Sequence, residues 1–220
     1  MGLALNRKIN NDARLGIWKI EESAEELLGM LQLTPMEKSV FAGLKTHERQ
    51  QQWLAYRIII KKLLNLDKVL DINYDKNGKP QIFNHSLYIS VTHSGTYAAA
   101  ILHSKLQPGI DIEKISPRIH KVKEKFLSQK ELDHIPEKTN TELITAYWCA
   151  KEALFKSYPS GITSLKEQIF ISPISPGDDS IIHGQIIHNT KTKSFVLSLE
   201  KIKDYILVYT IDETNHNAYQ

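Results

Sequence analysis

The stretch Glu142–Tyr158, ELITAYWCAKEALFKSY, predicts a long helix that is at least half buried. Within it, Trp148, Glu152 and Lys156 follow one another at spacings of four residues, which places them on one helical face. A Glu four residues before a Lys is by itself an ordinary helix-stabilising pair worth about 0.3–0.5 kcal/mol. Here aromatic and apolar residues surround the pair, and this setting favours a role beyond a solvated helix surface.

The strand expected at Gly109–Glu113 carries two carboxylates on one face. Successive strand side chains point to opposite faces, so Asp111 and Glu113 lie together while Ile112 enters the core. Neighbouring carboxylates repel unless a cation or proton lies between them, and Mg²⁺ is the usual cation for carboxylates that act on phosphates. The alternative is a solvated polar strand face.

The earlier part of the chain offers groups that could hold phosphate oxygens. Thr92-His93-Ser94-Gly95 is expected to form the turn between two strands, and Lys79 lies in an earlier turn, Gly78-Lys79-Pro80. Hydroxyls, an imidazole and backbone N–H groups beside a glycine can bind phosphate. The alternative is that His93, one of nine histidines, is an ordinary surface residue.

The two halves of the chain show a faint internal likeness. The helix expected at His47–Leu64 carries Trp53. Arg57 and Lys61 follow that tryptophan at the offsets at which the acidic and basic residues follow Trp148. The alternative is a chance similarity between two amphipathic helices.

This likeness predicts an α+β fold with two pseudo-duplicated subdomains, each a long helix packed on a small antiparallel sheet. Hairpins are expected at Leu87–Leu102 and Phe195–Ile211, after the two helices. We place the N-terminal subdomain at residues 1–104 and the C-terminal subdomain, with the metal site, at residues 105–220. Further helices are expected at Glu21–Leu33, from Thr34-Pro35 onward and at Lys121–Leu132.

Composition limits the class of protein. A chain of 220 residues can bury a core without disulfides, and Cys149, the one cysteine, excludes an internal disulfide framework. The net charge of +3, from 28 basic and 25 acidic residues, suits an anionic ligand or acidic partner and is too weak to indicate nucleic acid. We expect no membrane span and a cytoplasmic location, because neither a long apolar run nor a signal pattern occurs.

Together these motifs resemble the paired signature of the 4′-phosphopantetheinyl transferases. GIDIE at Gly109–Glu113 and WCAKEALFK at Trp148–Lys156 carry the resemblance. Between them, FLSQKE at Phe126–Glu131 is similar to the family's Phe-x-Ser-x-x-Glu element. The turns with Lys79 and His93 precede these motifs in the family's order. Length and internal likeness are similar to the surfactin-type (Sfp) branch, a pseudo-dimer in one chain.

The resemblance implies a Mg²⁺-dependent enzyme with holo-acyl-carrier-protein synthase activity. It would move phosphopantetheine from coenzyme A to a serine of an acyl, peptidyl or aryl carrier protein and release 3′,5′-ADP. Asp111, Glu113 and Glu152 would hold Mg²⁺. Glu152 would also accept the serine proton, and Lys156 would contact the pyrophosphate. The coenzyme A-binding residues implied are Arg57, Lys79, Thr92, His93 and Lys156.

The resemblance also implies a monomer and leaves the carrier pathway open, whether lysine biosynthesis or secondary metabolism. Lys121, Lys123 and Lys125 form a candidate docking stripe for an acidic carrier, or else a solvated helix face. Two other functions compete with the transferase: a catalytically silent relative that binds carriers or coenzyme A, and a different Mg²⁺-dependent phosphoryl-transfer protein. The second lacks support because the chain has no Gly-x-x-x-x-Gly-Lys loop.

Overall fold

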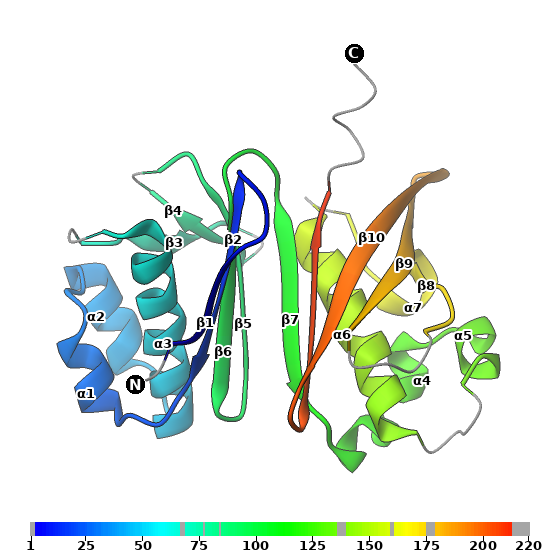
Figure 1. Ribbon diagram of the computed structural model, residues 1–220, viewed down its shortest axis with the longest axis horizontal. Coiled ribbons are helices and arrows are strands. Elements are labelled where there is room, and N and C mark those ends of the chain that lie inside the picture. Colours follow the sequence, from blue (N-terminus) through cyan, green and yellow to red (C-terminus); the bar gives the residue numbers. More distant parts are fainter. Residues whose placement is uncertain are drawn as a thin grey trace. The chain divides into compact units, whose positions relative to one another are not determined.

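The computed structural model describes residues 3–66, 69–76, 78–83, 85–135, 140–158, 161–174 and 179–212. The chain divides into two compact units, Met1–Lys105 and Leu106–Gln220 (Figure 1). Each unit has its own antiparallel sheet, its own long helix and its own hydrophobic core.

The first unit is built around the long helix α3 (His47–Leu64), whose bounds match the prediction. Its other elements are β1 (Leu3–Lys8), β2 (Ala13–Lys19), α1 (Ala24–Gly29), α2 (Pro35–Ala42), β3 (Ile72–Tyr74), β4 (Pro80–Ile82), β5 (Tyr88–Ser94) and β6 (Tyr97–His103). The main sheet is antiparallel in the order β1-β2-β6-β5, and β3 pairs with β4. Leu54, Ile59 and Leu63 of α3 are fully buried in the core of this unit.

N-cap residues determine where the short helices α1 and α2 of the first unit begin. Ser23 and Thr34 each accept a hydrogen bond from the backbone of the glutamate three residues later, and each glutamate bonds back, which makes two capping boxes. The helix expected from Glu21 is therefore shorter than predicted: α1 begins after Ser23 and ends at Gly29. The helix expected after Thr34-Pro35 is confirmed as α2.

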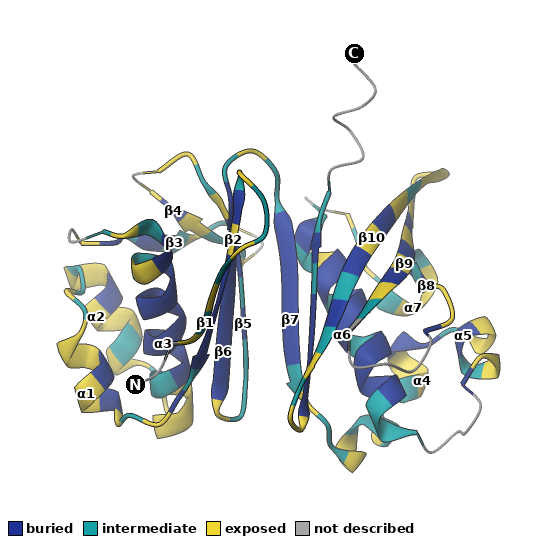
Figure 2. Ribbon diagram, in the orientation of Figure 1, coloured by how far each residue is buried: buried dark blue, intermediate teal, exposed yellow. Residues whose placement is uncertain are grey.

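The second unit packs the helix α6 (Thr141–Ser157) on a five-stranded antiparallel sheet. The strands are β7 (Pro108–Lys114), β8 (Ile169–Ile171), β9 (Asp179–His188), β10 (Lys191–Ile202) and β11 (Tyr205–Ile211), in the order β7-β11-β10-β9-β8. Short helices flank them: η1 (Pro117–Lys121), α4 (Lys123–Phe126), α5 (Gln129–Asp133) and α7 (Leu165–Gln168). Figure 2 shows that α6, like α3, is mostly buried.

The single helix expected at Lys121–Leu132 is wrong. The chain leaves the helical conformation at Leu127, whose ψ is 133°, and α5 restarts after Ser128. Ser128 and Glu131 form a capping box, which a helix passing through this point could not make. The Ser-x-x-Glu spacing was therefore the signal for the break.

The predicted α+β class is confirmed, since helices and antiparallel sheets make up both units. The pseudo-duplication stays a prediction, because the two sheets differ in strand number and order. Among the described residues, no helix has both the length and the hydropathy that a membrane crossing requires.

Candidate functional site

Strand β7 presents its carboxylates to the helix α6. A Cβ built on Gly109 would strike the backbone of Ala153, so this face of β7 lies directly against α6. Asp111 and Glu113 stand on the same face as Gly109, because strand side chains alternate. Ile112 is fully buried on the opposite face, as predicted.

Helix α6 supplies the residues that meet these carboxylates. Lys156 Nζ donates to Asp111 Oδ1 at 2.7 Å and to the Ile110 carbonyl oxygen at 3.0 Å. Asp111 is buried, with a side chain 6% exposed, whereas the Lys156 side chain is 26% exposed and reaches solvent. The ion pair fastens the last turns of α6 to β7.

Glu152 lies one helical turn before Lys156 and shares its electrostatic surroundings. Burial raises the pKa of Glu152 to about 7, and the charges of Asp111 and Glu113 add to the rise while Lys156 opposes it. The structure thus brings together Asp111, Glu113, Glu152 and Lys156 in the second unit. A carboxyl with a pKa near neutrality can both accept and release a proton.

Cys149 lies beside the same charges and is inert. Its thiol is fully buried and donates to the Ile206 carbonyl oxygen at 3.5 Å. Burial raises the pKa of Cys149 well above its ordinary value, and the charges of Asp111 and Glu113 raise it further. The raised pKa disfavours the nucleophilic thiolate, and its dependence on Asp111 and Glu113 indicates that the two carboxylates lie close to α6.

The donor set of this cluster fits a hard divalent cation. Asp111, Glu113 and Glu152 offer only oxygen ligands, which Mg²⁺ prefers, and the charges of the first two raise the pKa of Glu152. Oδ2 of Asp111 is buried and accepts no hydrogen bond from the residues that the structure describes. In that part of the chain, no three His, Cys, Asp or Glu side chains already form a metal-binding group. Asp111, Glu113 and Glu152 therefore supply the kind of ligand that such a cation binds.

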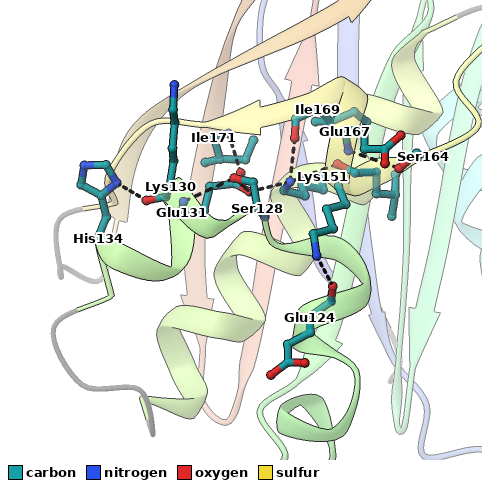
Figure 3. Close-up of polar contacts among 12 residues, drawn as sticks. Glu124, Ser128, Lys130, Glu131, His134, Lys151, Ser164, Glu167, Ile169 and Ile171 are labelled. Atoms are coloured by element: carbon teal, nitrogen blue, oxygen red, sulfur yellow. Dashed lines mark hydrogen bonds and ion pairs between the residues drawn. The ribbon is translucent and has the colours of Figure 1, made fainter.

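Lys151, next to Glu152 in the chain, makes its contacts away from β7, and the sequence did not indicate these contacts. Its ammonium group pairs with Glu131 of α5 at 2.8 Å in a buried ion pair (Figure 3). The Ser-x-x-Glu spacing before Glu131 and the adjacent Lys151-Glu152 doublet were the available signals, but neither indicates that the two charges meet.

In the first unit, the Arg57 side chain is buried and bonded to neighbouring side chains. Its Nε donates to Glu37 Oε1 at 3.1 Å, and its guanidinium lies 3.3 Å from the centre of the Trp53 ring. The guanidinium also donates to the hydroxyl of Tyr56, which contacts the hydroxyl of Tyr74. The predicted role of Arg57 in coenzyme A binding therefore rests on the sequence resemblance alone.

The other predicted phosphate-binding residues of the first unit lie on β5 and before β4. Thr92 is buried in β5, and His93, which is partly exposed, contacts the guanidinium of Arg49. Burial lowers the pKa of Lys79, whose backbone N–H donates to Asp75 Oδ1 at 2.9 Å.

The turn expected over Thr92-His93-Ser94-Gly95 is shorter than predicted. Thr92, His93 and Ser94 belong to β5 and pair with β6, which leaves Gly95 and Thr96 as the turn. Gly95 has a φ of 50°, a backbone conformation that glycine adopts without strain. β5 is the edge strand of its sheet, so pairing with β6 engages only part of the backbone of the residues before Gly95.

The second unit is thus an α+β domain with a cluster of carboxylates and a lysine between a strand and a helix. Residues 107–210 match the profile of the 4′-phosphopantetheinyl transferase superfamily. This stretch of the chain, which lies within the second unit, is thus similar to members of that superfamily.

Curated relatives carry names from the same superfamily. A Synechocystis sp. protein, provisionally named a 4′-phosphopantetheinyl transferase, is 30% identical over 125 residues, which are 53% of this chain and 51% of the relative. The mouse L-aminoadipate-semialdehyde dehydrogenase-phosphopantetheinyl transferase is 27% identical over 171 residues, 67% of this chain and 54% of the relative. The 4′-phosphopantetheinyl transferase AcpT of Escherichia coli K12 is 28% identical over 114 residues, 49% of this chain and 57% of the relative. The chain spans about half the length of the curated relatives that it matches.

Proposed function

We propose that this protein is a 4′-phosphopantetheinyl transferase that uses coenzyme A to modify a serine of a carrier protein. The observation that carries the proposal is the cluster on β7 and α6, where Lys156 pairs with Asp111 and the pKa of Glu152 is raised to about 7. All of these residues lie inside the stretch that matches the superfamily.

The reaction is a displacement at phosphorus. The serine Oγ forms a bond to the phosphate that bears pantetheine, and the bond from that phosphate to the bridging oxygen of the pyrophosphate breaks. 3′,5′-ADP leaves with the electron pair. Glu152, which lies beside Asp111 and one helical turn before Lys156, accepts the serine proton, directly or through a water.

Lys156 serves the leaving group. Its side chain is partly exposed, and its ammonium group, which pairs with Asp111, can contact the pyrophosphate oxygens, where negative charge grows as the bond breaks. Asp111 holds Lys156 in place through the 2.7 Å contact. Mg²⁺, held by Asp111, Glu113 and Glu152, would neutralise charge on the pyrophosphate when bound.

The remaining assignments follow the sequence resemblance. Lys79, Thr92, His93 and Arg57 of the first unit are proposed to bind the nucleotide and phosphates of coenzyme A. We further propose that the enzyme acts as a cytoplasmic monomer. The name of the mouse relative adds a carrier domain of the L-aminoadipate-semialdehyde dehydrogenase type to the acyl, peptidyl and aryl carriers as candidate substrates.

Intact-mass spectrometry of apo carrier proteins tests the function. Incubation with the protein, coenzyme A and Mg²⁺ should add the mass of one phosphopantetheine group to at least one carrier. Glu152→Gln and chelation of the metal should each abolish the gain. Glu142→Gln, which removes an exposed charge from the first turn of the same helix, is the matched control and should keep full activity.

Each outcome has a distinct meaning. No gain on any carrier, despite measurable binding of coenzyme A, would favour a silent binding protein. A gain that survives Glu152→Gln would keep the function and overturn the assignment of the base.

A further inference from the structure

A buried ion pair lies on the side of α6 opposite β7. Lys151 and Glu131 have side chains 0% and 3% exposed, and Lys151 Nζ lies 2.8 Å from Glu131 Oε2 (Figure 3). The same ammonium group donates to the carbonyl oxygens of Leu165 at 3.0 Å and Ile169 at 2.6 Å. All three hydrogens of the ammonium group therefore have acceptors, which come from α5, α7 and β8.

Both carboxylate oxygens of Glu131 also have hydrogen-bond partners. Its Oε2 accepts from the backbone N–H and the hydroxyl of Ser128, each at 2.8 Å, in addition to Lys151. Its Oε1 accepts from the backbone N–H of Ile171 in β8 at 2.9 Å. The carboxylate is thus fixed by its own helix cap and by the edge of the sheet, so the position it offers to Lys151 is rigid.

The two sides of α6 are consequently anchored to different elements. Ala153 and Ser157 lie against Gly109 of β7. Lys151 precedes Ala153 by two residues, which places it about 160° around the helix, on the far side. Glu152 stands between these two anchors in the sequence, so the angle at which it faces the carboxylates of β7 depends on both.

We propose that Lys151 and Glu131 are positioning residues that set the rotation of α6, and through it the place of Glu152 beside Asp111. The inference rests on the proposed transferase function. A buried ion pair contributes little net stability compared with apolar side chains of the same volume. Its directional contacts, by contrast, favour one helix rotation over its neighbours.

A small rotation of α6 is enough to change the rate of the reaction. Side chains of a helix end about 5–6 Å from its axis, so a rotation of roughly 10° moves a carboxylate by about 1 Å. A displacement of about 1 Å at a reacting group lowers the rate by roughly 100-fold. The ion pair therefore affects turnover without touching the substrate.

The double variant Glu131→Gln/Lys151→Met tests this, because it removes both charges and nearly keeps the volume. We expect a folded protein with an unchanged KM for coenzyme A and a kcat lowered roughly 10- to 100-fold. Glu131→Asp alone, which keeps both charges and shortens one side chain, should give a smaller fall in kcat. It also serves as the test protein if the double variant does not fold.

The matched control is Glu142→Gln/Lys201→Met. This pair also joins α6 to the sheet, at 2.7 Å, but it is exposed and lies at the first turn of the helix. We expect its kcat to stay within twofold of wild type. A fall in the control equal to that in the buried-pair variant would overturn the inference, since any lost ion pair on α6 would then suffice.

A crystal structure of the double variant gives a second measurement that does not depend on activity. We expect α6 to be rotated and the Lys156 Nζ–Asp111 Oδ1 contact of 2.7 Å to be lost. A stable double variant with wild-type kcat, or one in which α6 superposes and this contact remains, would overturn the inference. If the wild-type protein modifies no carrier, the proposed function has failed, and the position of α6 in the variant still decides the inference.

Discussion

Gly109 permits the close approach of α6 to β7, and Gly109→Ala is the sharpest perturbation of the site. A Cβ at this position would lie 1.8 Å from the carbonyl oxygen and 2.8 Å from the carbonyl carbon of Ala153, and 3.0 Å from Ser157 Cβ. Ordinary contacts begin at 3.4 Å. Because the obstacle is helix backbone, no side-chain rotation relieves it, and α6 must withdraw by roughly 1.5 Å.

Two effects follow from that withdrawal. Overpacking of a buried contact costs about 1–3 kcal/mol, and a backbone obstacle places the expected loss at the upper end, about 3 kcal/mol. Glu152 and Lys156 move with the helix, so turnover should fall by roughly 100-fold or more. The variant should therefore be less stable and, in its folded fraction, a poor enzyme.

Urea denaturation measures the first effect, and the rate of carrier modification by intact-mass spectrometry measures the second. Gly29→Ala is the matched control, because a Cβ there meets nothing within 4 Å. It should be neutral or slightly stabilising, since alanine has the higher helix propensity. A Gly109→Ala protein that loses less than about 0.5 kcal/mol and keeps its rate within twofold would refute the reasoning.

Three further predictions concern single residues. In metal-free protein, burial and nearby negative charge raise the pKa of Glu152 from 4.5 to about 7, so the folded state binds its proton more tightly than the unfolded chain. The free energy of unfolding should therefore fall as the pH rises from 4.5 to about 7. In urea denaturation with chelator, the free energy of unfolding of Glu152→Gln should exceed that of wild type by about 2 kcal/mol at pH 8 but not at pH 4. Equal free energies for the two proteins at both pH values would contradict this. The buried thiol of Cys149 should react with an alkylating reagent at pH 8 only as fast as the fold opens, which mass spectrometry measures. Prompt labelling of the native protein would show that the thiol is accessible. Glu37→Ala should lower the free energy of unfolding by about 3 kcal/mol, because it leaves Arg57 buried without its carboxylate; a loss below about 1 kcal/mol, measured by denaturation, would argue against a strong pair.

The amino-acid sequence by itself determined the local elements and the chemistry that they carry. Apolar spacing predicted the helices at His47–Leu64 and Glu142–Tyr158, and the structure has both within one residue at each end. Alternation along Gly109–Glu113 predicted two carboxylates on one strand face with Ile112 buried between them. These features depend on periods of a few residues, so a short stretch of sequence contains all the information that they need.

Only the tertiary structure decided which groups meet. The sequence contained Glu131 and Lys151, yet their ion pair exists because the fold brings one residue of α5 within 2.8 Å of one residue of α6. Arg57 carries a charge that patterning alone would place in solvent, but Glu37 and the Trp53 ring enclose it. Burial and electrostatic coupling depend on neighbours that are distant in the chain, and the spacing of residues along one element cannot specify those neighbours.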